Sequence, residues 1–471
     1  MELSEINIEE TIKKTEALLD SDQDVSPALK SSIKILLVLV SLLVNQLGLN
    51  SKNSSKPPSS DPNRKKTKKE PGERKLGGQN GHNGKNLQKV SNPDVVKKIA
   101  VDKTTLPEGD YTEAGYETRQ VIDIDISRFV TEYQAQILED ANGKRHIAPF
   151  PKGVNRPVQY GVNLKAHSVY MSQYQLIPYG RVEENFLDQA GIPISSGSIY
   201  NFNNEAYEKL EAFEDILRAK LIDSCLCHAD ETGINIGGKR KWLHCISNKR
   251  WTYYLPHEKR GAVAMEAMDV LPHFQGVLCH DHWKPYFRFA CQHSLCNAHH
   301  LRELERAWEQ DKQEWARDVR ELLLEINMAV EDAGGRLAAS DSEKYRQKYR
   351  SLMQKAQKEC PPPDEKQRKG KRGRLKRSKA RNLLERLIDY ENETLRFMDD
   401  EKIPFSNNQG ENDIRMTKVQ QKISGCFRSM SGAAIFCRIR SYLSTCKKHD
   451  VRASEALRLL FDGKLPEFLT A

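Results

Sequence analysis

Residues 225–233 read Cys-Leu-Cys-His-Ala-Asp-Glu-Thr-Gly, and residues 276–286 read Gly-Val-Leu-Cys-His-Asp-His-Trp-Lys-Pro-Tyr. In each stretch a short apolar run of strand character leads into an aspartate, Asp230 in the first and Asp281 in the second. A carboxylate at a buried strand end is costly unless its charge is compensated. We therefore expect these aspartates to face a bound cation.

A third acidic residue stands in a similarly distinctive setting. Residues 406–415, Ser-Asn-Asn-Gln-Gly-Glu-Asn-Asp-Ile-Arg, open a helix-like run that contains Glu411. Magnesium prefers hard oxygen ligands and keeps part of its water, so three carboxylates and a substrate phosphate can hold it. Two such ions stabilise the attacking and leaving oxygens of an in-line displacement at phosphorus. The sequence thus predicts a two-metal site at Asp230, Asp281 and Glu411.

The segments around the aspartates predict a ribonuclease-H-like core with a mixed sheet. A strand is expected to end at Asp230, and two more are expected at 241–247 and 251–255, which together form a meander. A crossover helix at 261–271 and a strand at 276–280, parallel to the first, would follow. The long stretch between Asp281 and Glu411 is helical and highly charged, so we expect an insert to interrupt the core.

The fold class expected for the whole chain is multi-domain α+β. The apolar seam of residues 36–47 fits either a helix packed on the protein or a short oligomerising helix. Residues 121–126 alternate with the period of a strand, and Gly191 marks the turn of a helix-turn-helix-like hairpin, which need not bind DNA. The predicted organisation is an N-terminal helical segment (1–50), a basic linker (51–88), a small β module (89–155), a helical, helix-turn-helix-like region (156–221), the core (222–302 and 401–432), the insert (303–400) and a C-terminal helical element (433–471).

Composition favours a protein of the reducing cytoplasm with a polyanionic partner. The 471 residues carry a net charge of +9, with 38% hydrophobic and 30% charged residues. The ten cysteines do not have the even spacing of a small secreted disulfide framework. An acidic start is unlike a secretory leader, and the interrupted apolar run at 33–49 is short for a bilayer span, so no membrane partner is expected.

Three groups of basic residues and the single residue Lys284 are candidate phosphate contacts. Ten of the sixteen residues in 366–381 are Lys or Arg, although such a run is often only a solvated loop. Residues 411, 415, 418 and 422 share one helical face, which would be either a solvated stripe or a track for DNA leaving the site. The candidates are Arg64, Lys65 and Lys66 in the linker, Arg372 and Arg374 in the insert, Arg415, Lys418 and Lys422 on the glutamate helix, and Lys284 near the second aspartate.

Several motifs together resemble one known family. They are Asn-Ser-Ser-Lys-Pro-Pro-Ser-Ser-Asp at 53–61, Gly-Gly-Gln-Asn-Gly-His at 77–82, His-Ala-Asp-Glu-Thr-Gly at 228–233, Cys-Asn-Ala-His-His-Leu-Arg-Glu-Leu-Glu at 296–305 and Asn-Asn-Gln-Gly-Glu-Asn-Asp-Ile-Arg at 407–415. In this order they resemble bacterial transposases of the insertion sequence 66 family, over nearly the whole chain. The resemblance implies a DDE transposase that nicks mobile-element ends and joins them to target DNA with Mg²⁺ or Mn²⁺.

The same resemblance assigns roles and partners. By motif match, Asp230, Asp281 and Glu411 take the three carboxylate positions, and Cys296 and His299 form a Cys-x-x-His signature that supports the active site. The implied partners are element ends and target DNA, a second copy of the chain and accessory proteins of the same element, in the bacterial nucleoid. Two alternatives remain: a structure-selective nuclease with the same fold and metals but no joining step, and a non-catalytic DNA-binding derivative.

One departure from the family pattern concerns zinc. Family members commonly carry a small cysteine-based zinc unit, but residues 89–150 contain no cysteine and only one histidine, His146. We therefore expect no structural zinc of the thiolate type there. The Cys and His cluster at 291–300 fits local packing, DNA contact or zinc, and its spacing lacks the two separated pairs of a usual structural zinc site.

Overall fold

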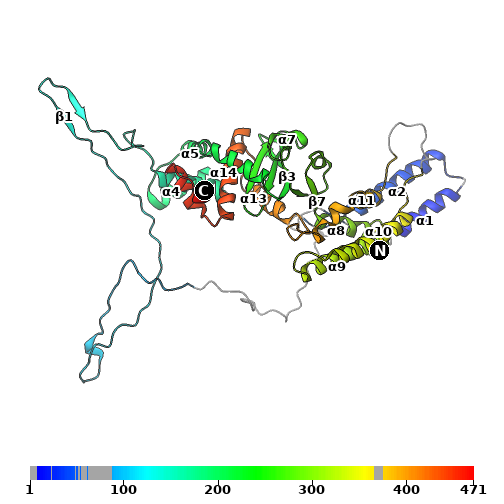
Figure 1. Cartoon of the computed structure of the whole chain (residues 1–471), viewed down its shortest axis with the longest axis horizontal. Coiled ribbons are helices and arrows are strands. Elements are labelled where there is room, and N and C mark those ends of the chain that lie inside the picture. Colours follow the sequence, from blue (N-terminus) through cyan, green and yellow to red (C-terminus); the bar gives the residue numbers. More distant parts are fainter. Residues whose placement is uncertain are drawn as a thin grey trace.

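The computed structural model describes residues 8–22, 24–47, 49–50, 53–54, 61, 87–364 and 375–470. Within these ranges the chain has a mixed α+β architecture with fifteen α-helices, a central five-stranded sheet and a separate two-stranded one. The architecture agrees with the predicted α+β class. Figure 1 shows the sheet near the middle of the long axis, with α4 and α5 on one side and the insert helices on the other.

The central sheet has the strand order β5-β4-β3-β6-β7. Strands β3, β4 and β5 form an antiparallel meander, β6 runs parallel to β3, and β7 runs parallel to β6. The predicted meander, crossover helix and parallel strand are therefore confirmed, whereas β7 was not predicted. The elements are β3 (Leu226–Ile236), β4 (Lys239–Ser247), β5 (Thr252–His257), α7 (Ala262–Ala267), β6 (Val277–His280) and β7 (Gln292–Leu295).

One expectation about β3 is wrong. The strand does not end at Asp230 but continues to Ile236, because residues 229–236 still pair with β4 after the pairing with β6 has stopped at His228. Asp230 consequently lies within β3, two residues beyond the last residue of β3 that pairs with β6. The side chain of Asp230 still lies beyond the C-terminal end of the parallel pairing between β3 and β6.

The two faces of the sheet are covered by different helices. Side chains alternate between the faces of a strand. Cys227 and Ala229 on β3 face the larger apolar core, which includes residues of α3, α5, α6, α14 and α15, whereas Ile234 and Ile236 pack against α13 and part of α14. These helices are α3 (Val162–Val169), α5 (Ser196–Lys209), α6 (Glu211–Ile222), α13 (Asn408–Ser424), α14 (Met430–Lys448) and α15 (Ala453–Phe461).

Helix α14 also protects the open edge of the sheet. The backbone N–H of Tyr254 donates to Ser441 Oγ at 2.9 Å, and the N–H of Thr252 donates to Thr445 Oγ1 at 3.2 Å. An edge strand otherwise presents unpaired donors to solvent or to other chains. Two hydroxyl groups one turn apart on a buried helix thus satisfy the donors of β5.

The insert is a helical unit with its own apolar core. Buried Trp315, Leu323, Tyr349 and Leu384 belong to this core, which is separate from the two cores of the sheet. Helix α12 connects the unit to the sheet through β7. The predicted helical character of 303–400 is confirmed for the described residues, with helices α8 (Asn297–Glu309), α9 (Glu314–Asp332), α10 (Ala339–Glu359), α11 (Lys379–Asp389), α12 (Glu391–Leu395) and the 3-10 turn η7 (Arg396–Met398).

The helical region before the sheet matches the expected helix-turn-helix shape. Helices α4 (Tyr179–Ala190) and α5 are joined through Gly191, whose φ of +62° is a left-handed conformation that glycine adopts without strain. Helix α6 follows α5 directly, and Leu210 lies between the two helices. A π-helical turn, η4 (Tyr170–Tyr174), continues α3.

Residues 87–155 differ most from expectation. The only regular strands described there are β1 (Ile137–Glu139) and β2 (Arg145–Ile147), which form a short hairpin, together with the turn η3 (Lys103–Thr105). The strand predicted at 121–126 is absent, and Val121 is 93% exposed. A lone extended segment has no neighbour to pair its backbone groups and no core to bury its apolar face. Figure 1 shows this region extending away from the body of the protein.

Two helices precede the linker. Helix α1 (Ile8–Ser21) packs against α2 (Pro27–Leu47), and the predicted helical character of this segment is confirmed. The stretch Pro27–Val44 has a mean hydropathy of 1.9 and none of it is buried, so by length and composition α2 could cross a membrane. Because α2 is a single apolar helix near the N-terminus, this is weak support for a span, and the absence of a transmembrane segment stays a prediction.

We predict that Gly276→Ala destabilises the fold by about 1–3 kcal/mol, the usual cost of overpacking a core. A Cβ atom there would lie 2.5 Å from the carbonyl oxygen of Ser224 and 2.6 Å from that of Cys225, at the start of β6. Urea unfolding monitored by circular dichroism measures the change. The matched control is Gly180→Ala in the first turn of α4, where nothing lies within 4 Å of the added atom. Equal stabilities of both variants and the parent would contradict the prediction.

Candidate active site

The parallel pairing of β3 and β6 places Asp230 beside Asp281. His228 pairs with Cys279 in the last matched position of the two strands, and each aspartate follows two residues later. Neighbouring strands lie about 4.8 Å apart, and residues two apart on a strand share a face. His282 directly after Asp281 has a φ of +37°, so the chain turns sharply away from the sheet there. The two carboxylates consequently emerge together on one face.

Glu411 approaches the same face from α13. This helix packs against β3 and β4, and its Ile414 joins Ile234 and Cys245 in the apolar core on that side. Cys245 is the cross-strand partner of Asp230, so Asp230 points toward the helix that carries Glu411. A buried ion pair between Asp413 and Lys448, with 2.7 Å between Oδ2 and Nζ, fixes α13 against α14.

The electrostatics show that neighbouring acidic groups act on Asp230. Burial, followed by the charges of Glu231 and Asp281 and a smaller contribution from Glu411, raises the pKa of Asp230 to about 8. Burial also raises the pKa of Asp281, although Arg260 opposes the shift. Like charges held close in a partly dry site disfavour their ionised forms. A divalent cation would remove this repulsion, so the cluster has the chemistry of a cation site.

A buried asparagine connects the elements of the site. The Nδ1–H of His228 donates to Asn407 Oδ1 at 2.8 Å, and Asn407 Nδ2 donates to the carbonyl oxygen of Ala229 at 2.8 Å. The backbone N–H of Asn407 donates to Cys296 Sγ at 3.1 Å, and its carbonyl oxygen accepts from the N–H of Glu411. Asn407 therefore links β3, the start of α8 and the first turn of α13. A Cβ on Gly410 would come within 3.0 Å of the Asn407 side chain, so glycine makes room for this link.

Cys296 and His299 lie next to Glu411, as the motif resemblance implies for supporting residues. Their ligand atoms and a carboxylate oxygen of Glu411 all fall within 4.8 Å of one another, so the three could hold a metal ion. His299 Nδ1 is 3.6 Å from Glu411 Oε1, and both atoms are buried without a hydrogen-bond partner. Burial, together with Arg302, lowers the pKa of His299 to about 4, so its imidazole is neutral at pH 7.

The predicted basic residues are placed unevenly around the site. Burial and Arg240 lower the pKa of Lys418 while Asp230 raises it, so Lys418 lies within electrostatic reach of Asp230. Its Nζ donates to the carbonyl oxygen of Gly233 at 3.4 Å. Arg415 and Lys422 are exposed on α13, and Lys284 is exposed in the 3-10 turn η5 (Lys284–Arg288). The linker candidates Arg64, Lys65 and Lys66 and the insert candidates Arg372 and Arg374 lie outside the described residues.

Comparison with known families identifies the chain. The family model described as "Transposase IS66 family" matches residues 157–435, which is more than half of the sequence. The chain belongs to the IS66 transposase family. A second model, for a family of unknown function (DUF6444), matches residues 2–88. No curated protein matches the chain.

The IS66 match covers the structural parts described above. It begins before α3 and ends within α14, so it contains the whole central sheet, the insert and α13. The motif resemblance to this family is thereby confirmed.

The structure of this IS66 protein also reveals a residue network that the sequence did not single out. Glu231 has a side chain only 2% exposed, and it accepts hydrogen bonds from Arg260 at 2.6 Å and from Tyr286 Oη at 2.5 Å. The guanidinium of Arg260 lies over the rings of Trp242 and Trp283 at 4.9 and 4.1 Å. Period-two alternation along β3 could have shown that Glu231 faces away from Asp230, but nothing in the sequence pairs it with Arg260.

We predict that Asn407→Ala lowers the free energy of unfolding of this IS66 protein by about 1–3 kcal/mol for each buried group that loses its partner. The affected groups are His228 Nδ1 and the carbonyl oxygen of Ala229. The control is Asn412→Ala, which removes an exposed side chain one turn further along the same helix. Urea titration of both variants is the measurement, and equal losses in the two would show that Asn407 is not a structural link.

Proposed function

We propose that this chain is a DNA transposase that cuts phosphodiester bonds at mobile-element ends and joins the freed ends to target DNA. The observation that carries the proposal is the emergence of Asp230 and Asp281 together on the sheet face that α13 covers with Glu411. Membership of the IS66 family supports the reaction class. DNA is the substrate that this reaction requires, and the net charge of +9 agrees with a polyanionic partner.

We further propose a ribonuclease-H-like core. The strand order β5-β4-β3-β6-β7, with an antiparallel meander followed by two parallel strands, supports this assignment. The helical insert between β7 and α13 would then interrupt the core, as the domain organisation predicted from the sequence has it. Its position between the second aspartate and the glutamate places it beside the proposed site.

The proposed ligands of Mg²⁺ or Mn²⁺ are Asp230, Asp281 and Glu411. When bound, two such ions would stabilise the charge on the attacking and leaving oxygens of the phosphodiester. The donor set fits, because it consists of hard carboxylate oxygens. Glu411 Oε1 is buried and forms no hydrogen bond, although it lies 3.6 Å from His299 Nδ1 and 3.7 Å from Arg302 Nη2. Burial raises the pKa of both Asp230 and Asp281, and the charge of Asp281 adds to the shift at Asp230, so a bound cation would stabilise both carboxylates.

Other residues of the chain would hold these carboxylates in place. Asn407 fixes the first turn of α13 against β3, so the position of Glu411 depends on it. Arg260 pairs with Glu231 and partly offsets the charge near Asp281. Lys418 lies close enough to feel the charge of Asp230, so it is placed to meet a phosphate that enters the site.

The remaining assignments are proposals that follow from this function. The DNA contacts would include Arg415, Lys418, Lys422 and Lys284 and the basic clusters of the linker and the insert. A homo-oligomer would hold the two element ends, with accessory proteins of the element as further partners. The protein would act in the bacterial cytoplasm, on nucleoid DNA.

We predict that Asp230→Asn, Asp281→Asn or Glu411→Gln each lowers DNA cleavage by at least about 10³-fold, because each removes a charged ligand that the reaction needs. The assay is Mg²⁺-dependent nicking of a supercoiled plasmid that carries the element. Asp269→Asn, at an exposed carboxylate, is the control and should cleave at the parental rate. Full cleavage by any of the three variants would refute its assignment.

The joining of element ends to target DNA distinguishes a transposase from a nuclease of the same fold. We expect parental protein, given pre-nicked ends and a supercoiled target in Mg²⁺, to yield covalently joined products that appear on a denaturing gel. EDTA should abolish them. Cleavage without any joined product would favour the structure-selective nuclease.

A further inference from the structure

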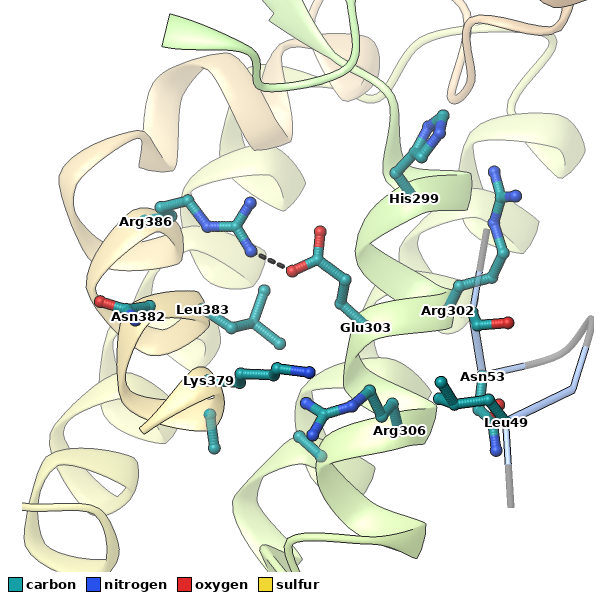
Figure 2. Close-up of a pocket in the computed structure, with 13 residues that line it drawn as sticks. Leu49, Asn53, His299, Arg302, Glu303, Arg306, Lys379, Asn382, Leu383 and Arg386 are labelled. Carbon is teal, nitrogen blue, oxygen red and sulfur yellow. Dashed lines mark hydrogen bonds and ion pairs between the residues drawn. The ribbon is translucent and has the colours of Figure 1, made fainter. Parts of the chain in front are cut away.

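A cationic pocket lies between the first and fourth helices of the insert, α8 and α11. Its volume is about 370 Å³. Figure 2 shows the side chains of Glu303, Arg306, Lys379 and Arg386 converging in the space between the two helices. Of these residues, only Lys379 belongs to the basic run 366–381 that is proposed above as a DNA contact.

The charge of the pocket is strongly unbalanced. Four cationic side chains, those of Arg302, Arg306, Lys379 and Arg386, line it against the single carboxylate of Glu303. Arg386 pairs with Glu303, but Lys379 is exposed and pairs with no carboxylate among the described residues. Arg306 donates from Nη1 and Nη2 to Asp311 at 3.3 Å, and only its buried Nε has no hydrogen-bond partner. Lys379 is therefore the cation of the lining that is available for an anion, and the paired arginines add positive charge around it.

Two residues connect this pocket to the proposed active site. Arg302 and His299 line the pocket, and their nitrogens lie 3.7 and 3.6 Å from Glu411 Oε1. An anion bound in the pocket would thus lie close to the glutamate that α13 brings to the metal site. This proximity ties the pocket to the substrate of the reaction.

The N-terminal segment supplies part of the pocket wall. Leu49, Asn53 and Ser54 line it, and Asn53 Nδ2 donates to Glu309 Oε2 at 2.8 Å on α8. Asn50 and Asn53 also exchange backbone-to-side-chain hydrogen bonds at 2.8 and 3.2 Å, and Asn53 is only 2% exposed. The segment matched by the family of unknown function thereby has a structural role at the insert.

We propose that this pocket binds a backbone phosphate of single-stranded DNA next to the bond that is cut, an inference that rests on the proposed function. A volume of about 370 Å³ is at the small end of the ~300–1,000 Å³ typical of small-ligand sites, so it admits a nucleotide but no duplex. Arginine and lysine side chains neutralise phosphates without reading sequence. A DNA strand that has separated from its complementary strand near Glu411 is the polyanion that would enter this pocket.

The test is the salt dependence of binding, measured in EDTA so that no cleavage occurs. Fluorescence anisotropy gives the affinity of the full-length protein for a labelled oligothymidylate and for a blunt duplex of the same length at several salt concentrations. Lys379→Ala should reduce the slope of log affinity against log salt by about 0.7 for the single strand, the contribution of one phosphate contact. The slope for the duplex should stay at the parental value.

Two control variants make the result specific. Lys379→Arg keeps the cation and should keep the parental slope, and Lys355→Ala removes an equal charge from α10, outside the pocket lining. An unchanged single-strand slope in Lys379→Ala, or an equal loss on the duplex, would overturn the proposal. Because the assay involves no metal or chemistry, its outcome is independent of whether the three carboxylate variants lose cleavage.

Discussion

The parallel register between β3 and β6 is the constraint on which the proposed site depends. With His228 opposite Cys279, the next two residues of each strand bring Asp230 and Asp281 to the same face. A shift of one residue would turn one carboxylate to the opposite face, because side chains alternate along a strand. The apolar core between α6, α7 and the sheet, which includes Cys227 and Leu278, holds this register in place.

Glu411 is brought to this face by a long-range link. Asn407 connects the end of the parallel pairing on β3 with Cys296 and with the helix that carries Glu411, although almost 180 residues separate it from β3. The helical insert occupies much of the intervening sequence and keeps a core of its own. The same arrangement places the insert's first helix, α8, and its cationic pocket beside Glu411.

The sequence predicted the parts of the structure that depend on local pattern. Apolar runs and turn residues located the strands around Asp230 and Asp281, and helical periodicity located α13 and the insert helices. Local pattern gave the wrong strands where pairing with a distant segment determines the structure. Strand β3 continues through Asp230 because β4 still pairs with it. Residues 121–126 alternate like a strand but have no partner strand among the described residues. The contacts of Asn407 and Glu231, and the pocket that Lys379 lines, join residues far apart in the chain, so no spacing rule could have revealed them.

Anomalous scattering from a crystal of the protein soaked with Mn²⁺ would show directly whether Asp230, Asp281 and Glu411 bind a divalent metal. We predict anomalous peaks at coordination distance from the carboxylate oxygens of Asp230 and Asp281, with Glu411 as a third ligand. Manganese bound elsewhere, with none at Asp230 and Asp281 even at saturating concentration, would contradict it.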